Sequence, residues 1–170
     1  TTARNDAEAA ANFYIIMHAL AATVDRDQPI GPQLFDLAAA ARARTPDGSI
    51  IASMYDFVRA RYEADRDHWE ETRDAGINFR ASMVSLFYGE GDLKRTIQIG
   101  ALAGWDADNP TATWAGLIGF IIGRSGGEEV FGDDISETYW ITRTRRDFPD
   151  HTPDLEGEDT FPMMSERGLT

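Results

Sequence analysis

Two aspartates, Asp106 and Asp108, are the residues of this sequence that point most clearly to chemistry. They are the only charged residues between Thr96 and Gly123, and no Lys, Arg or His in that window can neutralise them. A carboxylate buried without a partner loses several kcal/mol or becomes protonated, and two close carboxylates also repel each other. A divalent cation that prefers oxygen ligands would remove both penalties. The pattern therefore indicates a metal site.

Local geometry favours a loop for this aspartate pair. Side chains two residues apart on a helix diverge by about 200°, whereas alternate side chains of an extended loop can point the same way. The dipeptide Asn109-Pro110 is typical of a helix N-cap followed by Pro at the first helical position. Both aspartates are therefore predicted to lie just before a helix, where Asn109 can add an amide oxygen.

A second interpretation of the same spacing involves no metal. Asp108 would help to cap the helix, and Asp106 would pair with an arginine distant in the sequence, such as Arg80 or Arg95. Because the pattern D-x-D occurs often by chance, spacing alone leaves both interpretations open.

The elements that must position the pair are predicted to be helices. Apolar residues recur at three- and four-residue spacing, which gives each segment one apolar face. The expected segments are residues 6–24, a helix that begins at Gly31-Pro32, and residues 50–72, 79–88, 93–103 and 110–122. Gly123 is expected to end the last helix, whose apolar part of 14 residues is shorter than the roughly 20 of a membrane span. A buried core helix is therefore predicted there.

Composition narrows the classes of partner. The 170 residues carry 16 Lys plus Arg against 29 Asp plus Glu, a formal net charge of −13, and they include no Cys. Such acidity argues against binding to nucleic acid or to an anionic membrane, whose readers are usually basic. The absence of Cys excludes disulfides, thiolate metal sites and Cys nucleophiles, and it fits a reducing, cytoplasmic location.

The chain is expected to divide into two parts of different character. Residues 1–123 are predicted to form a helical body. Residues 124–170 hold twelve acidic and five basic residues and are predicted to form an acidic, mostly irregular tail packed on that body. Within the tail, residues 137–142 have the composition of a short strand for which the sequence identifies no partner.

The segment from Gly104 to Asn109, GWDADN, resembles the ADP-ribosylglycohydrolase family when it is taken together with the helix that follows. That family ends its catalytic core with a Gly-rich D-x-D segment leading into a helix of the pattern G-x-x-G-x-x-x-G, which matches Gly116, Gly119 and Gly123 here. The resemblance covers residues 76–123. It implies an all-α fold, the orthogonal helical bundle of that family. Close helix packing is the expected role of the glycines.

The resemblance also implies an activity and a set of ligands. Members of the family are magnesium-dependent hydrolases that cleave the glycosidic bond joining ADP-ribose to a protein side chain or a small molecule. Asp106 and Asp108 would be ligands of Mg²⁺, and Asn109 would take the third position, where the family commonly has Thr or Ser. Gly104 and Trp105 would lie at the substrate, with Trp105 stacked on a ribose or base unless it is a core residue.

One part of the family pattern has no counterpart in this sequence. Relatives carry an N-terminal G-D-x-x-G segment and further acidic ligands, and nothing before Asp106 resembles them. The chain is therefore expected to be the C-terminal part of a longer enzyme whose general base lies elsewhere, and to associate with that missing segment or with a second chain. The alternatives are a non-catalytic relative that binds a nucleotide or a partner protein, and a helical domain with a purely structural cation.

Overall fold

The structure is a computed structural model that describes residues 4–72, 78–104, 106–132, 136–140 and 158–169. The described chain is mostly helical, with a single two-stranded sheet, which confirms the all-α prediction. It consists of two compact units, Thr1–Val130 and Phe131–Thr170. In the described residues, no helix has the length and apolar character needed to cross a membrane.

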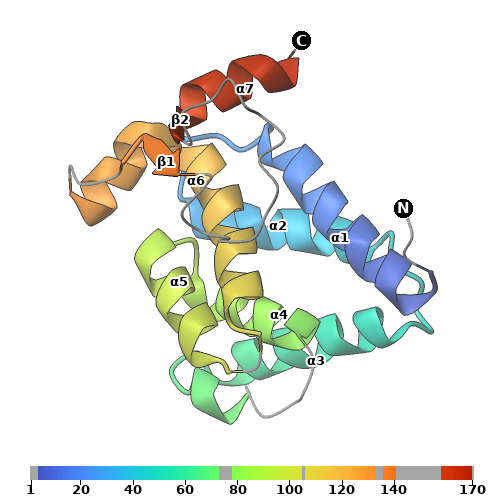
Figure 1. Cartoon of the computed structure of the whole chain (residues 1–170). Helices are drawn as coiled ribbons and strands as arrows, with labels where there is room; N and C mark the ends of the chain where they lie inside the picture. The colour runs from blue at the N-terminus through green and yellow to red at the C-terminus, as the bar shows by residue number, and fades with distance from the viewer. Residues whose placement is uncertain (1–3, 73–77, 105, 133–135, 141–157, 170) are drawn as a thin grey trace. The chain divides into compact units, whose positions relative to one another are not determined.

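The first unit contains most of the helices (Figure 1). In chain order these are α1 (Asp6–Ala21), α2 (Ile30–Arg42), α3 (Ile50–Ala64), the short 3-10 helix η1 (Trp69–Glu71), α4 (Asn78–Gly89), α5 (Leu93–Leu102) and α6 (Asp108–Phe131), whose last residue is assigned to the second unit. Helix α1 packs against α2 and α3, and α4 packs against α3 and α5.

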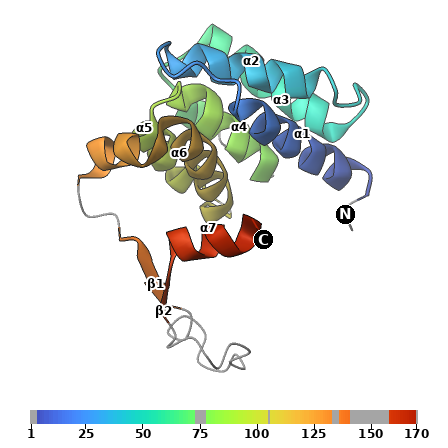
Figure 2. The same cartoon turned by 90° about the horizontal axis from the view of Figure 1, so that it is seen from above.

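Helix α4 is the centre of the first unit. Every residue from Ala81 to Gly89 is buried, and Figure 2 shows α4 between the side formed by α1–α3 and the side formed by α5 and α6. Polar groups on such a helix need partners, because a buried polar group without a hydrogen bond is unfavourable. The Ser85 hydroxyl donates to the carbonyl of Thr96 at 2.7 Å, and the carbonyl of Ser82 accepts from Nε1 of Trp114, also at 2.7 Å.

Helix α2 and the turn after α4 approach each other backbone to backbone. Glu90 and Gly91 in this turn have φ values of 53° and 83°, a left-handed conformation that favours glycine. A Cβ atom added to Gly31 at the start of α2 would lie 2.2 Å from the carbonyl oxygen of Glu90. The two segments therefore touch at a distance that no side chain could occupy.

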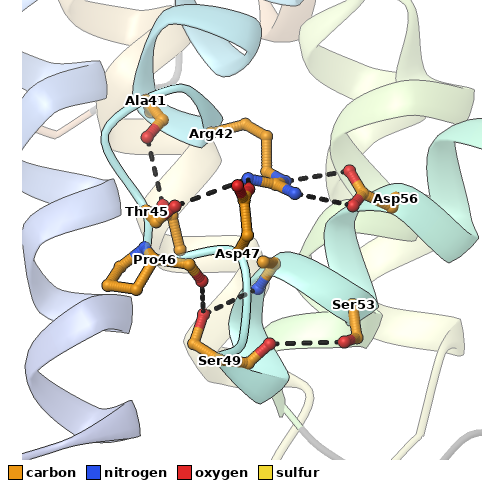
Figure 3. A network of polar contacts seen from close by, with 9 residues as sticks. Ala41, Arg42, Thr45, Pro46, Asp47, Ser49, Ser53 and Asp56 are labelled. Carbon is orange, nitrogen blue, oxygen red and sulfur yellow. Dashed lines mark hydrogen bonds and ion pairs between the residues drawn. The ribbon is translucent and has the colours of Figure 1, made fainter.

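Polar bonds join the end of α2 to the start of α3 (Figure 3). The Arg42 guanidinium donates to both carboxylate oxygens of Asp56, at 2.9 and 2.8 Å, and to Asp47 at 2.9 Å. Ser49 precedes α3 and caps it by accepting from the backbone N–H of Ala52 at 3.2 Å. We call Arg42, Asp47 and Asp56 the Arg42 network.

Helix α3 is shorter than the periodicity predicts. It ends at Ala64, whereas helix was expected to continue to residue 72. The Asp65 carboxylate accepts the backbone N–H groups of Asp67 and His68, at 2.9 and 3.3 Å, and such a local bond offers the backbone an alternative to the helix. His68 is exposed, and its Nδ1 lies 2.8 Å from the carboxylate of Asp65.

Helix α6 is longer than predicted at both ends. It begins at Asp108 and continues past Gly123 to Phe131. Gly123 does interrupt the helix, since its φ of 70° and ψ of −179° are not helical, but the helical backbone resumes after this kink. The helical body predicted for residues 1–123 lies within the first unit, whose last residue is Val130.

The second unit contains regular structure within the segment predicted to be a mostly irregular tail. Strand β1 (Thr138–Trp140) pairs antiparallel with β2 (Glu158–Thr160), and α7 (Phe161–Leu169) follows directly. The predicted strand is thus present, and its partner lies 20 residues along the chain. Residues 141–157, between the two strands, lie outside the described part.

One carboxylate organises this second unit. Asp159 is only 3% exposed, and burial alone would raise its pKa. Hydrogen bonds from Arg167, from the backbone N–H of Thr160 and from the Tyr139 hydroxyl outweigh that effect and lower the pKa. The contacts of Asp159 therefore join the sheet to α7.

Candidate functional site

The aspartate pair lies at the N-terminus of α6. Asp106 precedes the helix and Asp108 is its first residue. The backbone N–H of Asn109 donates to the carbonyl of Asp106 at 3.1 Å, which closes the turn into the helix. Carboxylates are favoured at this position, because the first backbone N–H groups of a helix carry partial positive charge.

The helix start differs from the prediction by two residues. Asn109 is the second residue of α6 and not its N-cap, and Pro110 is buried in the first turn. A proline is tolerated there because the first four N–H groups of a helix have no acceptor within the helix. The dipeptide therefore identifies the first turn correctly but not its first residue.

The two carboxylates approach each other. A side-chain hydrogen bond with Asp108, and the negative charge of Asp108, raise the pKa of Asp106. The amide of Asn78, at the start of α4, donates to Oδ2 of Asp106 at 2.9 Å and partly opposes this rise. The carboxylates of Asp106 and Asp108 therefore lie close enough to interact, and within the described part of the chain the side chain that donates to Asp106 from another element, the Asn78 amide, carries no charge.

The aspartate pair is exposed in the structure, although its neighbours in the sequence are apolar. Asp106, Asp108 and Asn109 are all exposed. The two carboxylates are therefore not buried as predicted, since α6 turns its apolar face to the core and leaves Asp108 and Asn109 at its start in solvent. Repulsion between the two like charges remains.

Neither arginine considered as a partner reaches Asp106. Arg95 lies within ion-pair distance of Glu90, with 3.9 Å between Nη1 and Oε2. The guanidinium carbon of Arg80 lies over the ring of Phe57, 3.5 Å from its centre. The interpretation without a metal predicted a salt bridge from Asp106 to Arg80 or Arg95, and the structure has neither. It also predicted that Asp108 caps the helix, and Asp108 does lie in the first helical turn.

A cavity of about 360 Å³ adjoins the pair. Asn78, which contacts Asp106, and Asn109 both line it, and its wall continues over Asp6, Tyr14, Met54 and Phe79. Neither Asn78 nor Asp6 was predicted from the sequence. No local pattern marks them, because the contact of Asn78 with Asp106 spans 28 residues and Asp6 is supplied by the first helix.

The two residues expected at the substrate have different outcomes. Gly104 is exposed and has a φ of 82°, so it makes the turn out of α5 in a conformation that other residues rarely adopt. Trp105 lies outside the described residues. The glycines expected to allow close helix packing, Gly116, Gly119 and Gly123, have open space where a side chain would begin, whereas Gly100 of α5 meets Thr111 and Ser85 closely.

The donors present at the pair match one side of a hard-cation site. Two carboxylates and the amide of Asn109 are oxygen donors of the kind that Mg²⁺ prefers, and Mg²⁺ commonly keeps several water ligands. Within the described ranges, no group of three or more His, Asp or Glu side chains could hold a metal ion. The pair therefore fits a cation only with further ligands from water, substrate or another segment.

Comparison with known proteins adds no relative: no family model, no curated protein and no solved structure matches this chain.

Proposed function

We propose that this chain is the C-terminal part of a magnesium-dependent hydrolase of the ADP-ribosylglycohydrolase type. Its substrates would be ADP-ribosylated proteins or small molecules, and the bond cleaved would be the glycosidic bond to ADP-ribose. One observation carries the proposal: the Asp106 and Asp108 carboxylates converge at a helix N-terminus beside a cavity. The resemblance of the segment from Gly104 to Gly123 supplies the reaction.

Asp106 and Asp108 would hold the Mg²⁺, with Asn109 as a further oxygen donor. The chemistry that a bound Mg²⁺ supplies is stabilisation of negative charge and orientation of the ribose hydroxyls and of water. The hydrogen bond from Asn78 fixes the direction of the Asp106 carboxylate, so Asn78 is a positioning residue. The remaining ligands and the general base would come from an upstream segment or a second chain.

The cavity beside the pair is where the substrate would enter. Tyr14 and Phe79 contribute aromatic surface to its wall, and such surface suits a ribose or a base. Trp105, which follows the turn at Gly104, remains a proposed stacking residue.

The test is the release of ADP-ribose from an ADP-ribosylated arginine or serine substrate by the full-length protein, with Mg²⁺ and with EDTA. Release is expected only with Mg²⁺, and Asp106→Asn combined with Asp108→Asn should lower it at least about 100-fold, since the metal ligands are lost. The chain offers a matched control in Asp65 and Asp67, a second exposed D-x-D pair. The double variant Asp65→Asn/Asp67→Asn should keep the wild-type rate.

Equal release by the wild type and the Asp106/Asp108 variant would contradict the proposal. Calorimetric titration with Mg²⁺ then separates the alternatives. Binding of Mg²⁺ and ADP-ribose without hydrolysis would identify a non-catalytic relative. Binding of Mg²⁺ without any affinity for ADP-ribose would identify a structural cation.

A further inference from the structure

Two arginines from neighbouring helices meet over one aromatic ring. The guanidinium carbon of Arg80, on α4, lies 3.5 Å from the centre of the Phe57 ring, and that of Arg61, on α3, lies 5.4 Å from it. Phe57 and Arg61 are one helical turn apart on α3. The face of a phenyl ring attracts cations, so Phe57 holds both guanidinium groups in place. We call these three residues the Arg61–Arg80 cluster.

This cluster has positive charge without a counter-charge. Among the described residues, no carboxylate lies within ion-pair distance of Arg61 or Arg80, whereas Arg59 and Arg95 each have one and Arg42 has two. Nε of Arg80 is buried and has no hydrogen-bond acceptor. A buried donor without an acceptor is unfavourable by about 1–3 kcal/mol. Burial, and then the charge of Arg61, lower the pKa of Arg80.

An anion placed between the two guanidinium groups would remove these penalties together. It would accept the Arg80 donor and neutralise two like charges in a chain whose net charge is −13. A guanidinium presents its N–H groups as a planar fork that fits two oxygens of a phosphate or a carboxylate. Two guanidinium groups match two negative charges, which a phosphate group carries and a single carboxylate does not.

We propose that Arg61, Arg80 and Phe57 form a binding site for a phosphate group. The two arginines would bind the phosphate oxygens, and the Phe57 ring would form the adjacent wall. The site shares no residue with the Asp106–Asp108 pair and needs no metal. It therefore adds a second ligand-binding function to the one proposed above.

The experiment is a titration of the chain with inorganic phosphate and with pyrophosphate, in EDTA and at physiological ionic strength, followed by NMR of the arginine Nε–H groups. The Arg80 and Arg61 signals of the wild type should shift and saturate. Arg80→Gln and Arg61→Gln should each weaken binding at least about tenfold, since a charge-assisted hydrogen bond contributes about 1.5–3 kcal/mol. Arg80→Lys should weaken it too, because the charge remains and the fork is lost.

Two controls give the result its meaning. Lys94→Gln removes one positive charge from an exposed position and should bind phosphate as the wild type does. Asp106→Asn/Asp108→Asn should also bind phosphate unchanged, which keeps this inference distinct from the failure or success of the proposed hydrolase.

Three results would overturn the assignment. The first is a wild-type shift that rises linearly without saturation, a readout that does not depend on whether any variant folds. The second is equal weakening by Lys94→Gln, which would indicate nonspecific charge attraction. The third is equal affinity for succinate and phosphate, which would show that the cluster does not select phosphate.

Discussion

The Arg42 network and the Asp106–Asp108 pair both bring two carboxylates together near the start of a helix, and they differ in what faces them. In the Arg42 network one guanidinium donates to both Asp47 and Asp56 (Figure 3). In the aspartate pair the carboxylates approach each other, and the neutral amide of Asn78 is the donor from another element. The first arrangement is explained by folding alone, and the second is not.

The same contrast appears with the opposite sign in the Arg61–Arg80 cluster. There two cations converge on a ring instead of on a carboxylate. Clusters of like charge oppose folding, and a ligand of the opposite charge would remove that penalty. The polar clusters therefore differ in kind: the charges of the Arg42 network are paired within the chain, whereas the other two clusters hold like charges for which an ion is proposed above.

The largest loss of stability should follow from removing a side chain that is fully buried and whose polar group is hydrogen-bonded. Trp114 is 0% exposed, and its Nε1 donates to Ser82 of α4. Trp114→Ala should lower the free energy of unfolding by about 3–5 kcal/mol, because it leaves a large cavity in the core and removes the hydrogen bond to the Ser82 carbonyl. Urea denaturation measures the change. The control Phe120→Ala, at an exposed position of the same helix, should change it by less than about 0.5 kcal/mol.

A smaller loss should follow from opening the Arg42 network. Arg42→Gln removes its bonds to Asp47 and Asp56, and we expect a loss of about 1 kcal/mol, since both carboxylates are largely exposed and screened by solvent. The loss should shrink in high salt. Arg44→Gln, two residues along the chain, is the matched control, since the Arg44 side chain donates to the Ala40 carbonyl and, among the described residues, forms no ion pair. An equal loss from both variants would contradict a specific role for the network.

The smallest effect, and one of opposite sign, should come from the aspartate pair. Because the pKa of Asp106 is raised in the folded chain, the folded state binds this proton more readily than the unfolded state does. Stability should therefore fall as the pH rises from about 4 through the raised pKa. Asp106→Asn should remove this fall and unfold at a slightly higher temperature at pH 7, without Mg²⁺.

Asp65 provides the contrast for this last measurement. Hydrogen bonds from the Asp67 backbone and from His68 lower its pKa, so its contribution is present above the usual Asp pKa and is lost as the pH falls through the lowered value. Asp65→Asn should therefore reduce the melting temperature at pH 7. A decrease with Asp106→Asn as well would show that the aspartate pair is a closed structural contact after all.

Much of the helical body was predictable because helices depend on local periodicity. The apolar stripes predict α1, α4 and α5 within a few residues of their observed ends. The errors lie where a side chain or a glycine acts against the periodic signal. The Asp65 carboxylate ends α3 early, and α6 resumes beyond the kink at Gly123. The partner of strand β1 could not be predicted because it lies about 20 residues along the chain and its residues, Glu158–Thr160, lack the composition typical of a strand.

The candidate site was predictable only in its local half. The D-x-D spacing and the proline after it identify the turn that brings Asp106 and Asp108 together. Asn78 contacts Asp106 through the packing of α4 against neighbouring helices, and no sequence pattern encodes such packing. The Arg61–Arg80 cluster has the same origin, since Phe57 meets Arg80 only because α3 packs against α4.

The backbone contact between Gly31 and Glu90 restricts which substitutions this chain can accept during evolution. Because a Cβ at Gly31 would overlap the carbonyl of Glu90, no amino acid other than glycine can be accepted there unless the turn moves away. Gly91 is held by the same contact and by its positive φ. A library randomised at both positions and selected for folded protein should return glycine at each. Selection would act there on the backbone, since neither residue has a side chain.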